Sequence, residues 1–159
     1  MRDRASAHIL VACLGLALAA CHSPTPPADG PTADDRAATR AALRQARGRW
    51  SSLGISDYSY AFRRSCFCAP PFTSPVRITV RDGRVAEVVL AETGQAASPE
   101  GYPTVDDLFG ILQEAVDSSA YDIRATYDPA RGYPTSFYID RSPAIADEEL
   151  GVEASDLRS

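Results

Sequence analysis

Two cysteines separated by a single residue, Cys66 and Cys68, are the side chains in this sequence with the clearest potential for chemistry. On a regular strand, residues i and i+2 lie about 6.5 to 7 Å apart at Cα, the upper limit for a disulfide. A bond between them therefore requires a bend. In an oxidising compartment an isolated pair favours a structural disulfide. A redox-active bridge, thiolate ligation of a metal, and free or intermolecular thiols stay open as alternatives.

Carboxylates form the second candidate group. They gather late in the chain, at Asp128, Asp140, Asp147, Glu148 and Glu149. Carboxylate oxygens can bind a hard cation such as Ca²⁺, but the spacing fits no calcium-loop template. A solvated acidic rim is the favoured interpretation, and we expect no metal site. Paired carboxylates also hydrolyse glycosides, but so small a domain, with no aromatic-lined cleft evident from the sequence, makes that a remote alternative.

Several side chains that catalysis depends on are missing. Lysine and asparagine do not occur in the chain, and its two histidines, His8 and His22, both precede the folded region. Histidine-assisted nucleophiles, lysine Schiff bases, Walker phosphate loops and histidine zinc sites each need one of these residues. We therefore expect no catalytic residue and no cofactor.

The chain begins with the layout of a secretory leader, residues 1–20. Arg2 and Arg4 precede an apolar run from Ile9 to Ala20, as in a signal peptide. The run is shorter than the roughly 20 residues that span a bilayer as a helix. Leu18-Ala-Ala-Cys21 matches the bacterial lipobox, which predicts cleavage before Cys21.

Resemblance to bacterial lipoproteins implies acylation of Cys21, and therefore a membrane partner reached through this lipid anchor. Several acyl chains together give lasting attachment. The residue after the cysteine is His22 rather than the aspartate associated with inner-membrane retention. The expected location is the cell envelope, with the outer membrane facing the periplasm favoured over the inner membrane.

The mature chain divides into two parts. Residues 21–33 combine the lipidated cysteine with a proline-rich tether, which tends towards extended geometry. Residues 34–159 are long enough for a single domain. The net charge is −5, and because the leader contributes +1, the mature chain lies near −6. An acidic chain without a basic patch is not expected to bind nucleic acid.

Hydrophobic periodicity predicts two helices and five or six strands. Capping boxes open the helices, strands follow from two-residue alternation, and Asp82-Gly83 marks a hairpin. The expected helices run from Thr32 to Leu53 and from Thr104 to Val116, and the expected strands are Asp57–Cys68, Val76–Val80, Val85–Leu90, Tyr121–Tyr127, Thr135–Ile139 and Leu150–Ala154. The simplest fold is α+β, an antiparallel sheet with both helices packed on one face.

A series of motifs in order gives the chain a family resemblance. The motifs are Tyr58-Ser-Tyr60, Cys66-Phe-Cys68, Val80-Arg-Asp-Gly83, Thr104-Val-Asp-Asp-Leu-Phe109, Tyr127-Asp-Pro129, Gly132-Tyr-Pro134, Ile139-Asp140 and Asp147-Glu-Glu149. With them the chain resembles the bacterial DUF6174 family of secreted proteins and lipoproteins, across roughly Trp50 to Val152. The resemblance implies a single extracytoplasmic domain and no particular activity.

These observations lead to two functional hypotheses. The first is a membrane-anchored lipoprotein whose small, non-catalytic domain has a binding or structural role towards an envelope protein partner. The alternative is a thiol redox or metal-handling envelope protein that uses Cys66 and Cys68. The missing catalytic side chains favour the first hypothesis.

Overall fold

A computed structural model of the protein describes residues 30–159, except for the side chain of Ala146. The predicted leader, the lipid attachment at Cys21 and most of the tether lie outside these residues. The start of the domain, predicted at residue 34, lies close to the first helical residue, Ala33.

Both helices begin where the capping-box pattern predicts. Helix α1 spans Ala33–Ser52 and helix α2 spans Val105–Asp117. Their N-caps, Thr32 and Thr104, each accept a hydrogen bond from the backbone of the aspartate three residues later, whose carboxylate in turn accepts from the N-cap backbone. This reciprocal arrangement satisfies backbone donors that the first turn of a helix leaves free.

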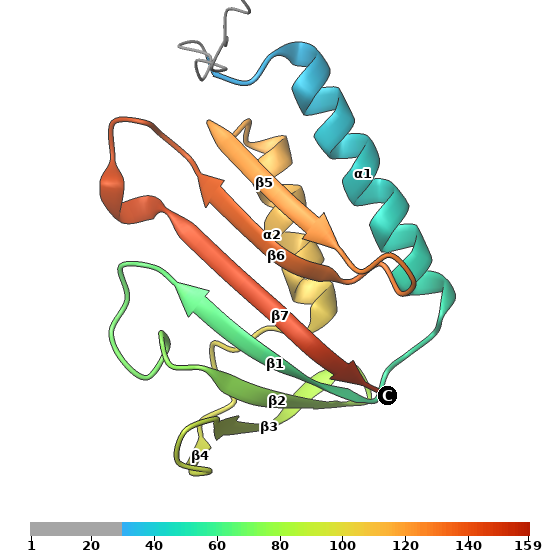
Figure 1. Cartoon of the computed structure of the whole chain (residues 1–159), viewed down its shortest axis with the longest axis vertical. Helices are drawn as coiled ribbons and strands as arrows, with labels where there is room; N and C mark the ends of the chain where they lie inside the picture. The colour runs from blue at the N-terminus through green and yellow to red at the C-terminus, as the bar shows by residue number, and fades with distance from the viewer. Residues whose placement is uncertain (1–29) are drawn as a thin grey trace, which may run out of the picture.

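Within residues 30–159, seven strands form one antiparallel sheet in the order β4-β3-β2-β1-β7-β6-β5 (Figure 1). Their bounds are β1 Tyr58–Ser65, β2 Val76–Arg81, β3 Arg84–Leu90, β4 Ala96–Ala97, β5 Asp122–Tyr127, β6 Pro134–Asp140 and β7 Leu150–Arg158. The sheet exceeds the expected five or six strands because of β4, whose two residues show no alternation. The last strand lies in the middle, paired with both β1 and β6.

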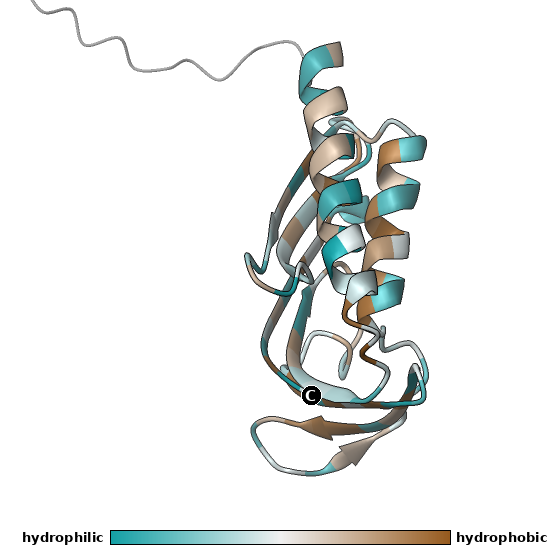
Figure 2. Ribbon diagram, turned by 90° about the vertical axis from the view of Figure 1, so that its right-hand side faces the viewer, coloured by the Kyte–Doolittle hydropathy of each residue, from teal (hydrophilic) through white to brown (hydrophobic). Residues whose placement is uncertain are grey.

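Both helices lie on the same side of the sheet (Figure 2). The buried aromatic and aliphatic side chains of β1, β2, β6 and β7 face them and form one core with the apolar residues of α1 and α2. The α+β class and the packing of both helices on one face are confirmed. No helix within residues 30–159 is long and apolar enough to cross a membrane.

Strand β1 is shorter than the alternation predicted. It ends at Ser65, and the cysteines follow in a bend. Pairing with β2 stops at Phe62 opposite Val76, so the last residues of β1 pair only with β7. The expected strand end at Cys68 was therefore wrong, because the chain leaves the sheet once its second neighbour is gone.

Two buried tyrosines of β1 connect the sheet to the start of α2. The hydroxyl of Tyr58 accepts a hydrogen bond from the backbone N–H of Val105 at 2.8 Å, and the hydroxyl of Tyr60 donates to the carbonyl of Pro103. The first N–H groups of a helix have no partner inside the helix. Tyr58 supplies one such partner in the core, where an unpaired N–H would be costly.

We predict that the free energy of unfolding falls as the pH rises from about 10 to about 12. Burial, with added repulsion from Asp106 and Asp107, raises the pKa of Tyr58 to about 12, whereas the unfolded chain ionises near 10. The contribution of the protonated Tyr58 hydroxyl to the free energy of unfolding is therefore complete below pH 10, and it is lost as the pH approaches the folded-state pKa. Denaturant titrations between pH 8 and 12 measure it.

The matched variant is Tyr58→Phe. At pH 8 it should be about 1–3 kcal/mol less stable, since the N–H of Val105 loses its partner, and its alkaline decline should be shallower. A decline as steep as that of the unmodified protein would contradict the assignment to Tyr58.

Candidate functional site

The cysteine pair lies in a loop at one end of the sheet. The β1–β2 loop, residues 66–75, and the β6–β7 loop, residues 141–149, leave the sheet side by side because Ser65 pairs with Gly151 (Figure 1). We call these two loops together the loop end. The predicted site residues Cys66 and Cys68 both belong to it.

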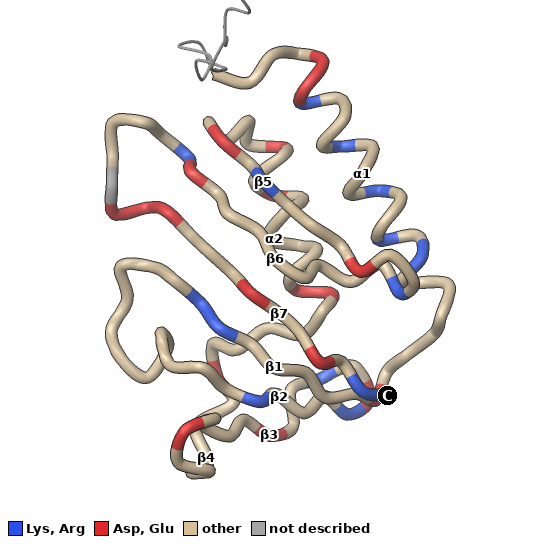
Figure 3. Tube along the Cα trace, in the orientation of Figure 1, with Lys and Arg blue, Asp and Glu red and all other residues tan. Residues whose placement is uncertain are grey.

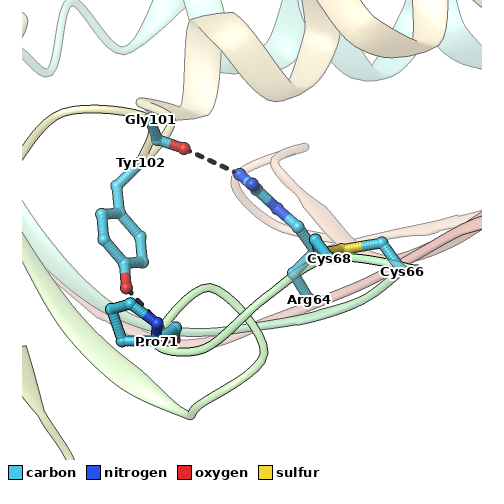
Figure 4. The surroundings of a disulfide bond; sticks show 6 residues. All are labelled: Arg64, Cys66, Cys68, Pro71, Gly101 and Tyr102. Atoms are coloured by element: carbon cyan, nitrogen blue, oxygen red, sulfur yellow. Dashed lines mark hydrogen bonds between the residues drawn. A yellow bond between two sulfur atoms is a disulfide. The ribbon is translucent and has the colours of Figure 1, made fainter.

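Cys66 and Cys68 form a disulfide across a Cα–Cα distance of 5.3 Å (Figure 4). This is shorter than the spacing on a regular strand and within the range that disulfides adopt. A bond between two cysteines one residue apart requires a bend in the strand, and the bend that follows Ser65 supplies it. Both cysteine side chains are half-buried, while Phe67 between them points to solvent.

Phe67 is the most exposed large hydrophobic residue of the part of the chain described here. Its side chain is 84% exposed, compared with 53% for Ile145 and 45% for Leu53. Ile145 also belongs to the loop end, whereas Leu53 caps the far end of α1. Of the three exposed large hydrophobics among residues 30–159, two therefore belong to the loop end.

Arg64 fixes the base of the β1–β2 loop. Its guanidinium lies 5.5 Å from the ring centre of Phe62 and 5.9 Å from that of Phe72, the range of a cation–π contact. It also donates a hydrogen bond at 2.9 Å to the carbonyl of Gly101 (Figure 4). One side chain thus connects the end of β1, the loop and the segment before α2.

The segment before α2 also holds the β1–β2 loop, through the side chain of Tyr102. The ring of Tyr102 packs against Phe72 at 5.7 Å, and its hydroxyl donates to the carbonyl of Pro71 at 3.5 Å. Gly101 adopts a positive φ of 81°, and a Cβ there would lie 2.9 Å from the Phe72 ring. Glycine is therefore required both by its conformation and by the close approach of the ring.

The late acidic residues do not form one cluster. Asp147, Glu148 and Glu149 belong to the β6–β7 loop (Figure 3). Asp140 accepts from the backbone of Ser142, while Asp128 turns the β5–β6 loop at the opposite end of β6. Within residues 30–159, no three His, Cys, Asp or Glu side chains are placed to hold a metal ion.

The disulfide partners were identified from the sequence, but the residues that support them were not. Arg64, two residues before Cys66, and Phe72, the one aromatic residue after Pro71 in the loop, have no spacing that marks a shared role. Tyr102 lies more than thirty residues away in sequence. The only local signal was Gly101-Tyr-Pro, which indicates a turn without indicating its neighbour.

Comparison with known proteins gives one match. The family described as "Family of unknown function (DUF6174)" matches residues 42–159. No curated protein matches the chain. No solved structure matches it either.

We predict that the double substitution Cys66→Ser/Cys68→Ser lowers the free energy of unfolding by only about 1–2 kcal/mol. The bridge closes a loop of three residues, so it removes little entropy from the unfolded chain. Its main effect is local, and the NMR order parameter at Phe67 should fall below about 0.6.

Reducing the bridge in the unmodified protein should reproduce both results. A loss of more than about 4 kcal/mol would show that the disulfide supports the whole fold instead.

Proposed function

The chain belongs to DUF6174, a family of unknown function that brings no activity with it, and we propose that it is a membrane-anchored binding module of the cell envelope. In this proposal the chain is acylated at Cys21, and the domain binds an envelope protein through Phe67. The observation that carries the proposal is an aromatic side chain, 84% exposed, on a loop restrained by a disulfide, by Arg64 and by Tyr102.

The energetics of Phe67 support a binding role. Burying a phenylalanine side chain contributes about 1.5–3 kcal/mol, and here that contribution is withheld from folding because the ring is 84% exposed. Binding also requires the ordering of interface side chains, which costs free energy. A loop restrained by a disulfide, by Arg64 and by Tyr102 is already ordered, so a partner pocket gains most of the burial energy.

The surroundings of Phe67 suit a protein surface as partner. Ile145 adds a second exposed apolar side chain to the loop end. Arg141 and the acidic residues 147–149 give the loop end charges of both signs. An apolar centre with a charged rim is the usual composition of a protein–protein interface, and aromatic anchors dominate the energy of such interfaces.

The proposed anchor rests on the sequence. The leader, the lipobox ending at Cys21 and the proline-rich segment after it form a consistent lipoprotein pattern. With residues 21–33 as a tether, the domain would stand tens of ångströms from the bilayer at about 3.1 Å per extended residue. That distance leaves the loop end accessible to periplasmic partners.

A thiol redox or metal-handling role has less support. Reactive thiols are usually activated at a helix N-terminus or beside a free cation, but Cys66 and Cys68 follow a strand, and the guanidinium of Arg64 is engaged by Gly101. A bridge that reduces reversibly at a mild potential would favour this role, and one that resists glutathione would exclude it.

We predict that Cys21→Ser abolishes acylation and membrane attachment in bacterial cells, because Cys21 provides the thiol that receives the lipid. Incorporation of an alkyne-labelled fatty acid, together with membrane fractionation, measures both effects. Cys13→Ser is the matched control and should keep the label. Label retained by the Cys21 variant, or lost from the Cys13 variant, would contradict the assignment.

We predict that Phe67→Ser weakens partner binding about ten- to a hundredfold, as expected for losing about 1.5–3 kcal/mol of buried aromatic surface. The partner is first identified by photo-crosslinking in cells, with benzoylphenylalanine in place of Phe67. Affinity is then measured with the full chain in detergent.

Leu53→Ser, which changes an exposed residue outside the loop end, serves as the control. An equal loss in both variants, or no specific crosslink from position 67, would overturn the proposal.

A further inference from the structure

The free edge of β5 is the longest unpaired edge in the described sheet. Strand β5 has six residues and pairs only with β6, whereas the opposite edge is the two-residue β4. Natural edge strands are usually kept short, bulged, interrupted by proline or covered. The register of β5 with β6 is regular from Asp122 to Thr126 and shifts only before the last residue, Tyr127, and the first proline after the strand is Pro129.

Helix α1 runs alongside this edge rather than over the middle of the sheet (Figure 1). Between them lies a groove of about 730 Å³, lined on the helix by Ala38, Thr39 and Ala42. The two alanines are exposed, so the helix side of the groove is open to solvent. The groove continues past Thr39 and Ile123 into a second hollow of about 400 Å³.

The side chains of β5 present two different faces to this groove. Ile123, Ala125 and Tyr127 pack against the core from its edge and are only half-buried. On the open face, Asp122 and Arg124 pair with each other at 2.9 Å, and both are partly exposed. Arg124 is held over the ring of Tyr138, 4.4 Å from its centre.

We propose that the groove binds an extended segment of a partner protein, which adds an eighth, antiparallel strand to the sheet at β5. Its backbone would pair with the free edge, as in strand-addition complexes. Alternate apolar side chains would cover Ile123 and Ala125 and rest on the small residues Ala38 and Ala42. The inference is independent of the proposed function, since the groove shares no residue with the loop end.

The charges define the partner segment. Cross-strand neighbours of opposite charge stabilise a sheet, and like charges destabilise it. An antiparallel segment therefore carries an acidic residue opposite Arg124 and a basic residue opposite Asp122, with an apolar residue between them opposite Ile123. Read from its N-terminus, the segment is apolar, acidic, apolar, basic.

A second copy of this chain fits the groove less well. Two-fold pairing of β5 with β5 would place both α1 helices on the same face of the joined sheet. Because α1 lies beside the edge it would extend, each helix would enter the space of the other. A single extended segment has no such conflict.

The test uses the hexapeptide Thr-Val-Glu-Val-Lys-Val and the full chain in detergent, with affinity measured by fluorescence anisotropy. A control peptide exchanges Glu and Lys. We predict saturable binding of the first peptide, protection of β5 backbone amides from hydrogen exchange, and weaker binding of the control. In the charge-reversed protein Asp122→Lys/Arg124→Glu, the preference should invert.

Ala42→Arg fills the groove and should weaken binding roughly tenfold or more. Ala41→Arg, at a neighbouring exposed alanine outside the groove, should leave binding unchanged, as should Phe67→Ser. Equal affinity for both peptides, no binding of either, or binding without protection of β5 would overturn the proposal. So would a dimer of the free chain in sedimentation that Ala42→Arg dissociates, which would identify a second copy instead.

Discussion

The hydrogen bonds from β1 to the start of α2 are the contacts on which the loop end depends. Tyr58 accepts from the N–H of Val105, and Tyr60 donates to the carbonyl of Pro103, both inside the core. These two hydrogen bonds fix the position of the segment before α2 relative to the sheet. Gly101 and Tyr102 belong to that segment and hold the β1–β2 loop. Two buried phenols are therefore connected, through a short series of contacts, to the β1–β2 loop that carries Phe67.

The stability of the loop and the stability of the fold come from different sources. The core is continuous from β2 to β6 and under both helices, and burial of that apolar surface is the main driving force of folding. The disulfide closes only three residues, so its effect is on local order. Loops on a rigid scaffold typically tolerate changes in sequence better than the core beneath them.

The central place of β7 explains the shape of both candidate surfaces. The last strand inserts between β1 and β6. It therefore brings the β6–β7 loop beside the β1–β2 loop, so the loop end consists of two loops instead of one. The same insertion moves the β5–β6 hairpin outwards, which leaves β5 at the edge beside α1. One strand placement thus generates two separate surfaces on a small domain.

Local features of the fold could be predicted from the sequence because they depend on short-range forces. The capping boxes at Thr32 and Thr104, the Asp82-Gly83 hairpin and the alternation of β1 each involve residues a few positions apart. A bond between Cys66 and Cys68 was the favoured interpretation of the isolated pair, with redox, metal-binding and free-thiol alternatives open, and the structure joins the two. The predicted end of β1 at Cys68 was wrong because strand length depends on the neighbouring strands.

The tertiary structure alone decided what depends on contacts distant in sequence. No pattern around Leu150 shows that β7 pairs with β1, since its alternation would serve at any position in the sheet. The contact of Arg64 with Gly101 and the open groove between α1 and β5 arise only when helices and strands pack. The sequence by itself determined the helices, most of the strands and the thiol pair, because local geometry and periodicity specify them. Packing decided which surfaces they share, because that choice is made by burial across the whole chain.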